Sequence, residues 1–97
     1  MPVHVVAVAE VKDPETMGQY SQKAGAALAK HGGRIVSVAA PDAALEDTGA
    51  ASAARFVLIE FPSAEDANGW ISDPELEPIH KLRQGGAKTT IRLLNPV

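Results

Sequence analysis

The apolar run at residues 56–61 constrains the fold more than any other part of this chain. It is interrupted only by Glu60 and is rich in β-branched and aromatic residues, which in so short a run favours a strand buried on both faces. Pro62 follows immediately and lacks the N–H that a sheet ladder needs, so we expect the strand to end there.

A helix is specified directly after this strand. Ser63 can cap its first turn, and Asp66, three residues later, can reach back toward the free backbone donors. The helix therefore begins at Ala64 and carries Trp70, the only tryptophan in the chain.

The end of the chain predicts one more helix and one more strand. Asp73-Pro74 breaks the first of these two helices, and Pro78 opens a short helix through Arg83, because proline is tolerated in a first turn and not deep inside a helix. Gly85-Gly86 ends this helix, and residues 88–94 form the last strand.

The first third of the chain predicts a strand and then a helix. Residues 3–11 alternate so that one face, occupied by the odd-numbered residues 3–9, is wholly apolar. Asp13 can cap a helix that has Pro14 at its first position and runs to about His31. An apolar stripe at spacings of three and four follows this helix: Met17, Tyr20, Ala24, Ala27, Leu28 and His31. One glycine of Gly32-Gly33 is expected in the left-handed conformation that ends helices.

A second strand and a long connection follow. Residues 34–40 form the strand, with Ile35, Val36 and Val38 as its packing residues. Residues 41–54 have no period and are dominated by alanine and small polar residues, so we expect a long mobile loop. Such a loop can be a lid or a tolerated surface insertion, and the second is the commoner case.

The resulting order, β-α-β-β-α-β, predicts an α+β fold of the ferredoxin-like type in a single domain, residues 1–97. Its four-stranded antiparallel sheet would carry the helices on one face. The other face then exposes the apolar side chains of Val6, Val8, Phe56 and Leu58, which we expect a second copy of the chain to cover. Two such sheets packed together form a dimeric α+β barrel.

Composition excludes several classes of partner. A net charge of −3, from 9 basic and 12 acidic residues, disfavours binding to nucleic acid or to a charged membrane. The chain has no cysteine, its three histidines are not clustered, and no Gly-x-Ser-x-Gly elbow is present, so we expect no metal, no cofactor and no nucleophile of these kinds. The first residues lack a basic leader, and a cytoplasmic location is the expectation.

The run from Phe56 to Arg83 resembles the small bacterial domain of unknown function 1330 family, through Glu60-Phe61-Pro62-Ser63, Ala67, Trp70, Ser72 and Leu82-Arg83. Upstream, Asp13-Pro14, Tyr20 and His31-Gly32-Gly33-Arg34 also fit that family. The resemblance implies a dimeric α+β barrel and brings no established activity. The chain departs from the family pattern at residues 37–40, where Arg-Gly-Gly is usual, and at Ile71 and Leu76, where aromatics are common.

The wider superfamily implied by this resemblance includes haem-degrading and cofactor-free monooxygenases. Trp70 and His80 have the ten-residue spacing of the haem-degrading members, in which the histidine binds iron. Residues 6–8 are Val-Ala-Val, so the asparagine that those enzymes carry in the first strand is missing, and we expect no specific haem binding.

Two groups of residues are candidates for a site. Tyr20, Trp70, His80 and Arg83 are candidate ligand-binding residues; for Trp70 the alternative is core packing, and for His80 a surface or half-buried helix position. His4, Glu60 and Arg92 are candidate catalytic residues, because antiparallel pairing that places Val6 opposite Leu58 brings His4 opposite Glu60 on the face away from the helices.

Charged groups on such an apolar wall either form a structural ion-pair network or line a polar pocket. Three functions therefore stay open: a dimeric barrel that binds a small organic molecule, a cofactor-free or haem-dependent monooxygenase or isomerase, and a purely structural dimer. The sequence does not choose between an enzyme and a binding protein.

Overall fold

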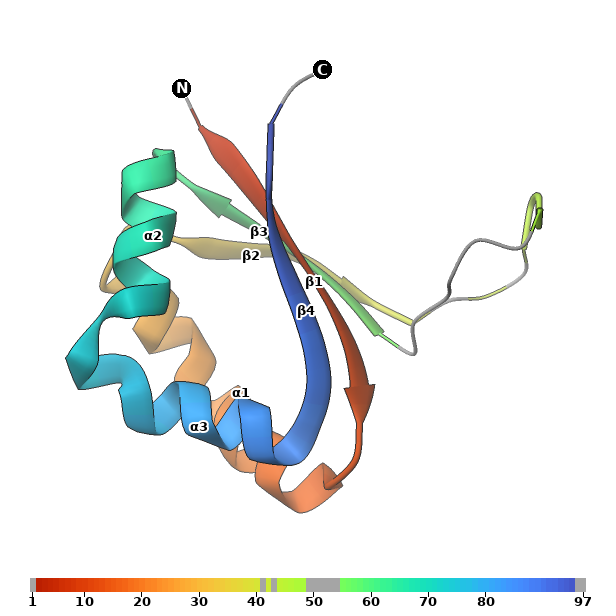
Figure 1. Cartoon of the computed structure of the whole chain (residues 1–97), viewed down its shortest axis with the longest axis horizontal. Coiled ribbons are helices and arrows are strands. Elements are labelled where there is room, and N and C mark those ends of the chain that lie inside the picture. The colour runs from red at the N-terminus through yellow and green to blue at the C-terminus, as the bar shows by residue number, and fades with distance from the viewer. Residues whose placement is uncertain (1, 41, 43, 49–54, 96–97) are drawn as a thin grey trace.

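The computed structural model describes residues 2–40, 42, 44–48 and 55–95. They form an α+β fold in which one antiparallel sheet packs against three helices (Figure 1). The elements, in chain order, are β1 (Val3–Val11), α1 (Pro14–Ala29), β2 (Arg34–Ala39), β3 (Arg55–Phe61), α2 (Ala64–Ser72), the 3-10 turn η1 (Pro74–Leu76), α3 (Glu77–Gly86) and β4 (Ala87–Leu94). The predicted β-α-β-β-α-β order is confirmed.

The strand order in the sheet is β2-β3-β1-β4, and every neighbouring pair is antiparallel. The predicted register is confirmed, with His4 opposite Glu60, Val6 opposite Leu58 and Val8 opposite Phe56. Successive side chains of a strand point to opposite faces, so this register sends the odd-numbered residues of β1 toward the helices and the even-numbered ones away.

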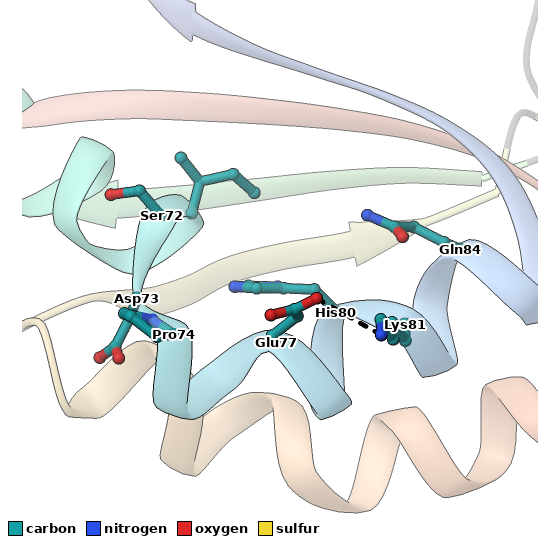
Figure 2. Close-up of a pocket in the computed structure, with 8 residues that line it drawn as sticks. Ser72, Asp73, Pro74, Glu77, His80, Lys81 and Gln84 are labelled. Carbon is teal, nitrogen blue, oxygen red and sulfur yellow. Dashed lines mark ion pairs between the residues drawn. The ribbon is translucent and has the colours of Figure 1, made fainter.

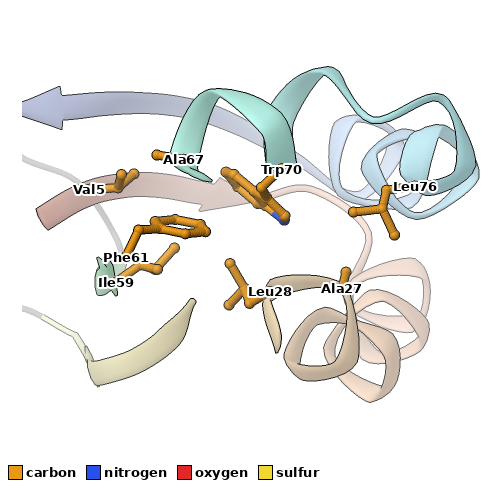
Figure 3. Packing of buried hydrophobic residues seen from close by; sticks show 8 residues of the cluster. All are labelled: Val5, Ala27, Leu28, Ile59, Phe61, Ala67, Trp70 and Leu76. Atoms are coloured by element: carbon orange, nitrogen blue, oxygen red, sulfur yellow. The ribbon is translucent and has the colours of Figure 1, made fainter. Parts of the chain in front are cut away.

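The hydrophobic core lies between the sheet and the helices. Phe61, which has no exposed surface, packs against Trp70 from α2 with ring centroids 5.7 Å apart (Figure 3). The other buried members of this core are Val5, Ala27, Leu28, Ile59, Ala67 and Leu76 (Figure 3). One apolar cluster therefore holds together β1, β3, α1, α2 and η1.

The predicted caps at Asp13 and Ser63 are confirmed, whereas the Asp66 carboxylate accepts from the Ser63 hydroxyl and not from a backbone donor. The Asp13 carboxylate accepts hydrogen bonds from the backbone N–H groups of Glu15 and Thr16, and the Ser63 hydroxyl accepts one from the N–H of Asp66. Gly32 has φ = 75°, the left-handed conformation expected of one of the two glycines.

Two helix ends differ from the prediction. α1 stops at Ala29 and not near His31, because the backbone N–H groups of His31 and Gly33 both turn back to the carbonyl of Leu28. α3 contains Gly85-Gly86 as its last turn and does not end before them. The carbonyl of Gly86 accepts hydrogen bonds from the N–H groups of Lys12 and Asp13, and these contacts hold the last turn in place.

Burial along two strands follows from how the helices cover the sheet. Within one chain β3 is buried on one face only: Ile59 and Phe61 are buried under the helices, while Phe56 on the opposite face is 39% exposed. β2 is an edge strand, so Ile35, Val36 and Val38 stay exposed and do not pack in the core. Both results follow from the helices covering only one face and only part of the width of the sheet.

A bulge in β2 decides which of its side chains face the helices. The pairing with β3 shifts by one residue between Ile35 and Ser37, leaving Val36 as the extra residue. As a result, Ile35 lies opposite Ile59 and Val38 opposite Val57, so both face the helical layer. The lid hypothesis for residues 41–54 falls mainly on residues outside the described ranges, since 41, 43 and 49–54 are not described.

Candidate functional site

A cavity of about 210 Å³ lies between the sheet and the helices, and the edge strand β2 borders it through Ile35 and Val38. Most of its lining is apolar and comes from both layers, including Met17, Ala24, Leu28, Ile35, Val57 and Ile91. The polar or aromatic side chains among its described lining residues are Tyr20, Ser21, Arg55, Trp70, Arg83 and Thr89. Three of the four predicted ligand-binding residues, Tyr20, Trp70 and Arg83, therefore line one cavity.

Arg83 is the unusual member of this lining, because its side chain is charged and only 5% exposed. Its carbon Cζ lies 5.7 Å from the ring centre of Tyr20 and 5.6 Å from that of Trp70, so the guanidinium is placed between two aromatic rings. Its Nη1 donates to Nδ1 of His80 at 2.9 Å, and its buried Nε has no hydrogen-bond partner among the described residues. Within the part of the chain that the structure describes, no carboxylate forms an ion pair with it.

His80 holds the side chain of Arg83 in place through a hydrogen bond. Its Nε2 donates to the backbone carbonyl of Trp70 at 3.0 Å, and its Nδ1 accepts from Arg83, so the ring is in the neutral tautomer that carries a proton on Nε2. Burial lowers the pKa of His80, and the nearby Arg83 charge lowers it further, against the hydrogen bond to Trp70. The geometry and the direction of the pKa shift thus agree on a neutral imidazole.

The expectation of a surface or half-buried His80 was wrong, since this side chain is only 5% exposed. Its ring meets the edge of the Trp70 ring, with centroids 5.1 Å apart and planes at 84°. The turn at residues 73–76 changes the direction of the chain after α2, and α3 then brings His80 into contact with Trp70, ten positions before it (Figure 1). Both ring nitrogens are engaged by the protein, which leaves neither free to ligate a haem iron in this conformation.

A second, more polar hollow of about 340 Å³ lies next to His80, at the connection between α2 and α3. It is lined by Ile71, Ser72, Asp73, Pro74, Glu77, His80, Lys81 and Gln84 (Figure 2). Glu77 and Lys81 form an ion pair at 3.4 Å along α3, one helical turn apart (Figure 2). Both partners are largely solvated, which makes this hollow a weaker candidate for a site than the inner cavity.

The predicted catalytic group on the open face is assembled only in part. Nε2 of His4 lies 3.3 Å from Oε2 of Glu60, as the register requires. The cation on the other carboxylate oxygen is Arg34, whose Nη2 lies 3.3 Å from Oε1 of Glu60. Arg92 shares this face, opposite Val6, but the structure gives it no ion pair among the described residues.

The grouping of Arg92 with Glu60 is therefore corrected to Arg34. The physical reason is the strand order, since β2 is the direct neighbour of β3, whereas β1 separates β4 from β3. The side chain of Arg34 is 64% exposed and that of His4 45% exposed. This cluster is a solvated ion-pair network, and no role in catalysis follows from it.

Sequence reasoning missed one further cluster. Asp73, between α2 and η1, lies 2.8 Å from Nζ of Lys30 and 2.8 Å from Nε2 of His31, both just after α1. Hydrogen bonds from Lys30, then from His31 and the N–H of Glu75, hold the pKa of Asp73 well below its usual range. His31, which the sequence placed on the apolar stripe of this helix, is thus part of a contact between the α1 end and the α2–η1 turn.

Two absences hold for the residues that the structure describes. No group of three or more His, Asp or Glu side chains there could hold a metal ion. None of the described helices has both the length and the apolar composition needed to cross a lipid bilayer.

The family model for the domain of unknown function DUF1330 matches residues 2–97. The chain belongs to the DUF1330 family. The family description assigns no activity, and the activity of this DUF1330 chain is unassigned. No curated protein matches it.

Solved structures share the fold of this DUF1330 chain. A protein of unknown function from Rhodopseudomonas palustris is 20% identical and superposes with a TM-score of 0.75, covering 99% of this chain and 82% of the other. SnoaB, a cofactor-independent oxygenase from Streptomyces nogalater, is 14% identical with a TM-score of 0.67, covering 99% and 93%. A dimeric ferredoxin-like protein of unknown function from Jannaschia sp. CCS1 is 8% identical with a TM-score of 0.62, covering 99% and 100%. At these identities the likeness concerns the fold alone.

Proposed function

We propose that this DUF1330 chain binds a small organic molecule in the cavity between the sheet and the helices. The observation that carries the proposal is an apolar space of about 210 Å³ bordered by the rings of Tyr20 and Trp70 and by buried Arg83. An empty apolar cavity of ~150 Å³ is large enough to bind benzene, so this one has room for a single ring with a small substituent.

The lining favours binding over acid–base catalysis. Among the described residues that border the cavity, none is a carboxylic acid or an imidazole, and these are the side chains that most often transfer protons at neutral pH. His80 does not border this cavity, and its Nδ1 accepts a hydrogen bond from the side chain of Arg83. We therefore assign the candidate residues Tyr20, Trp70 and Arg83 to ligand contact and His80 to the support of Arg83.

Occupancy of the cavity is tested with toluene as a neutral single-ring probe. Trp70 is the only tryptophan of the chain and borders the cavity, so its fluorescence reports binding directly. We expect a saturable change in emission and a rise in the unfolding temperature, since a ligand of the folded state stabilises it.

A matched pair of variants locates the probe. Ala24 borders the cavity, so Ala24→Leu should fill it and abolish both effects, whereas Ala26→Leu, at an exposed position of the same helix, should leave them unchanged. Wild-type protein that shows neither effect would leave the purely structural dimer as the better account.

The same proposal includes a homodimer formed through the open face of the sheet. Phe56 is 39% exposed there, and Val6, Val8 and Leu58 beside it are only partly covered, which makes an apolar patch on one protomer. The description of the Jannaschia neighbour as dimeric supports a homodimer. The cytoplasmic location stays a prediction from the sequence.

Light scattering tests the dimer. We expect twice the chain mass of 10.1 kDa at micromolar concentration and dissociation on Leu58→Asp, because a buried unpaired carboxylate is costly. Ile71→Asp, an exposed apolar position in α2 on the helical side, is the control and should stay dimeric. A monomeric wild-type protein would contradict the proposal.

A second candidate function is cofactor-free oxygenation, which SnoaB carries out in the same fold. The observation in its favour is buried Arg83 beside two aromatic rings, since a fixed cation stabilises the anion of an electron-rich substrate. In that reaction a substrate carbanion would give electrons to dioxygen and form a carbon–oxygen bond, with the proton first lost to solvent. Oxygen uptake with single-ring polyphenols that disappears in Arg83→Met would support it, and no uptake above the buffer rate would leave binding alone.

A further inference from the structure

The charged side chains among the described residues that line the cavity are all positive. Arg83 and Arg55 both border it, and none of its described lining residues is acidic. Arg55 is exposed at the start of β3, where water solvates it, but Arg83 is only 5% exposed. The buried positive charge therefore has no counter-charge from the described residues of the protein.

Arg83 also has more hydrogen-bond donors than the described residues provide acceptors for. A guanidinium carries five N–H groups, and among the described residues one protein acceptor faces them, Nδ1 of His80. Nε is buried and has no partner among the same residues. Buried polar groups are almost always paired, and each unpaired one costs free energy, so a charged donor left free inside the protein indicates a site for an acceptor that comes from outside.

His80 cannot act as the missing counter-charge. It is neutral where it accepts from Arg83, and its other nitrogen is tied to the carbonyl of Trp70. Its geometric effect is to hold the guanidinium in place between the rings of Tyr20 and Trp70. His80 is thus a positioning residue, and the site that it prepares is positive, rigid and bordered by aromatic faces.

We propose that the ligand of the cavity is a compact organic anion, the size of one ring with a carboxylate, whose negatively charged oxygens pair with Arg83. This inference rests on the proposed function, since it names the chemical class of the molecule that the cavity binds. Arg83 supplies the charge and the free N–H donors, and the planar guanidinium matches a carboxylate in geometry. The apolar walls and the two aromatic rings receive the remainder of the molecule.

The test compares benzoate with benzamide, which has nearly the same shape and no charge, and uses toluene as the neutral reference. Binding to the wild-type dimer is followed by Trp70 fluorescence and by calorimetry. We expect benzoate to bind about tenfold or more tightly than benzamide, the range that a charge-assisted hydrogen bond supplies. This preference should weaken little with salt, because a buried pair is poorly screened.

Two variants assign the preference to Arg83. Arg83→Met keeps the length and the apolar stem, and it should lose the preference for benzoate while still binding toluene. Lys81→Met removes one positive charge from the exposed side of the same helix and should behave as wild type. If Arg83→Met does not fold, judged by circular dichroism, the wild-type comparison of benzoate with benzamide decides alone.

The outcomes separate the two proposals. Toluene binding with equal affinities for benzoate and benzamide would overturn the anion inference and keep the proposed function. No binding of any of the three probes would overturn both. A benzoate preference that survives in Arg83→Met and disappears in Arg55→Met would place the anion at the exposed rim and contradict the assignment to Arg83.

Discussion

Nδ1 of His80 accepts a hydrogen bond of 2.9 Å from Nη1 of Arg83, a cation three residues further along α3. The contact is possible only while His80 is neutral, because a protonated imidazole has no acceptor left. The protonation state of one buried ring therefore decides whether the guanidinium beside the cavity keeps its only protein acceptor among the described residues.

The first prediction follows from that contact. Burial is the main cause that lowers the pKa of His80, with Arg83 adding to it and with Asp73 and the Trp70 carbonyl opposing it. A solvated histidine has a pKa of about 6.5, so as the pH falls below that value the unfolded chain binds a proton that the folded chain does not. The free energy of unfolding should therefore decrease as the pH is lowered, until the pH is below the lowered pKa of His80 in the native protein.

Urea denaturation at a series of pH values and a fixed protein concentration measures this effect. His80→Gln retains one donor and one acceptor but does not titrate, so its stability should vary less with pH across the same window. An NMR titration of the His80 ring gives the native pKa directly. A value at or above that of a solvated histidine would contradict the prediction.

The second prediction concerns Asp73. Its pKa is held well below the usual range, chiefly by the hydrogen bond from Lys30 and then by that from His31. For a carboxylate of this kind, the stabilisation is present above the unfolded pKa of about 3.9 and is lost as the pH falls through the lower native value.

Asp73→Asn should lower stability at pH 7 and reduce the further loss between pH 4 and pH 2, measured by thermal unfolding. Asp42→Asn is the control, since Asp42 is an exposed carboxylate and should keep the acid sensitivity of the wild type. Equal acid sensitivity of Asp73→Asn and wild type would show that the contact between α1 and the α2–η1 turn contributes nothing.

The third prediction contrasts two adjacent glycines. A Cβ on Gly86 would lie 2.7 Å from Cγ and 3.0 Å from the backbone N of Met17, whereas a Cβ on Gly85 would have no neighbour within 4 Å. Both lie in α3 without a positive φ. We expect Gly85→Ala to stabilise the fold by ~0.5–1 kcal/mol. Gly86→Ala should destabilise it by ~1–3 kcal/mol, the usual cost of overpacking. Equal changes in urea midpoint for the two variants would refute the packing of α3 against α1.

The fourth prediction tests the corrected ion-pair network on the open face. A double-mutant cycle between Glu60 and Arg34 should give a coupling of ~0.2–1 kcal/mol, since both side chains are reached by water. The matched cycle between Glu60 and Arg92 should give a coupling near zero, because β1 lies between their strands. A larger coupling for Arg92 than for Arg34 would restore the arrangement that the sequence suggested.

The sequence by itself determined the layers and the central register. Alternation with a period of two fixes which side chains of a strand share a face, and antiparallel pairing then carries that assignment across to the neighbouring strand. His4 opposite Glu60 was predictable for this reason. The caps at Asp13 and Ser63 were predictable because they depend only on residues two and three positions away.

Arg34 was not predictable from the same rule. Without the bulge in β2, Ile35 would lie opposite Glu60 and Arg34 would face the helices. One extra residue reverses the face of everything beyond it, and a bulge has no reliable sequence signal. Assigning faces from the alternation of side chains alone therefore selected Arg92 as the partner of Glu60. Arg92 lies on the correct face of the sheet, but β4 is two strands away from β3.

Only the tertiary structure decided how the candidate site is built. The sequence named Tyr20, Trp70 and Arg83 as candidate ligand-binding residues without placing them in contact, and they meet because α1, α2 and α3 pack on one face of the sheet. The burial of His80 and the missing counter-charge of Arg83 depend on the same packing. Local pattern sets where a side chain points, whereas burial and unpaired charge depend on every element that packs around it, and those contacts join residues far apart in the chain.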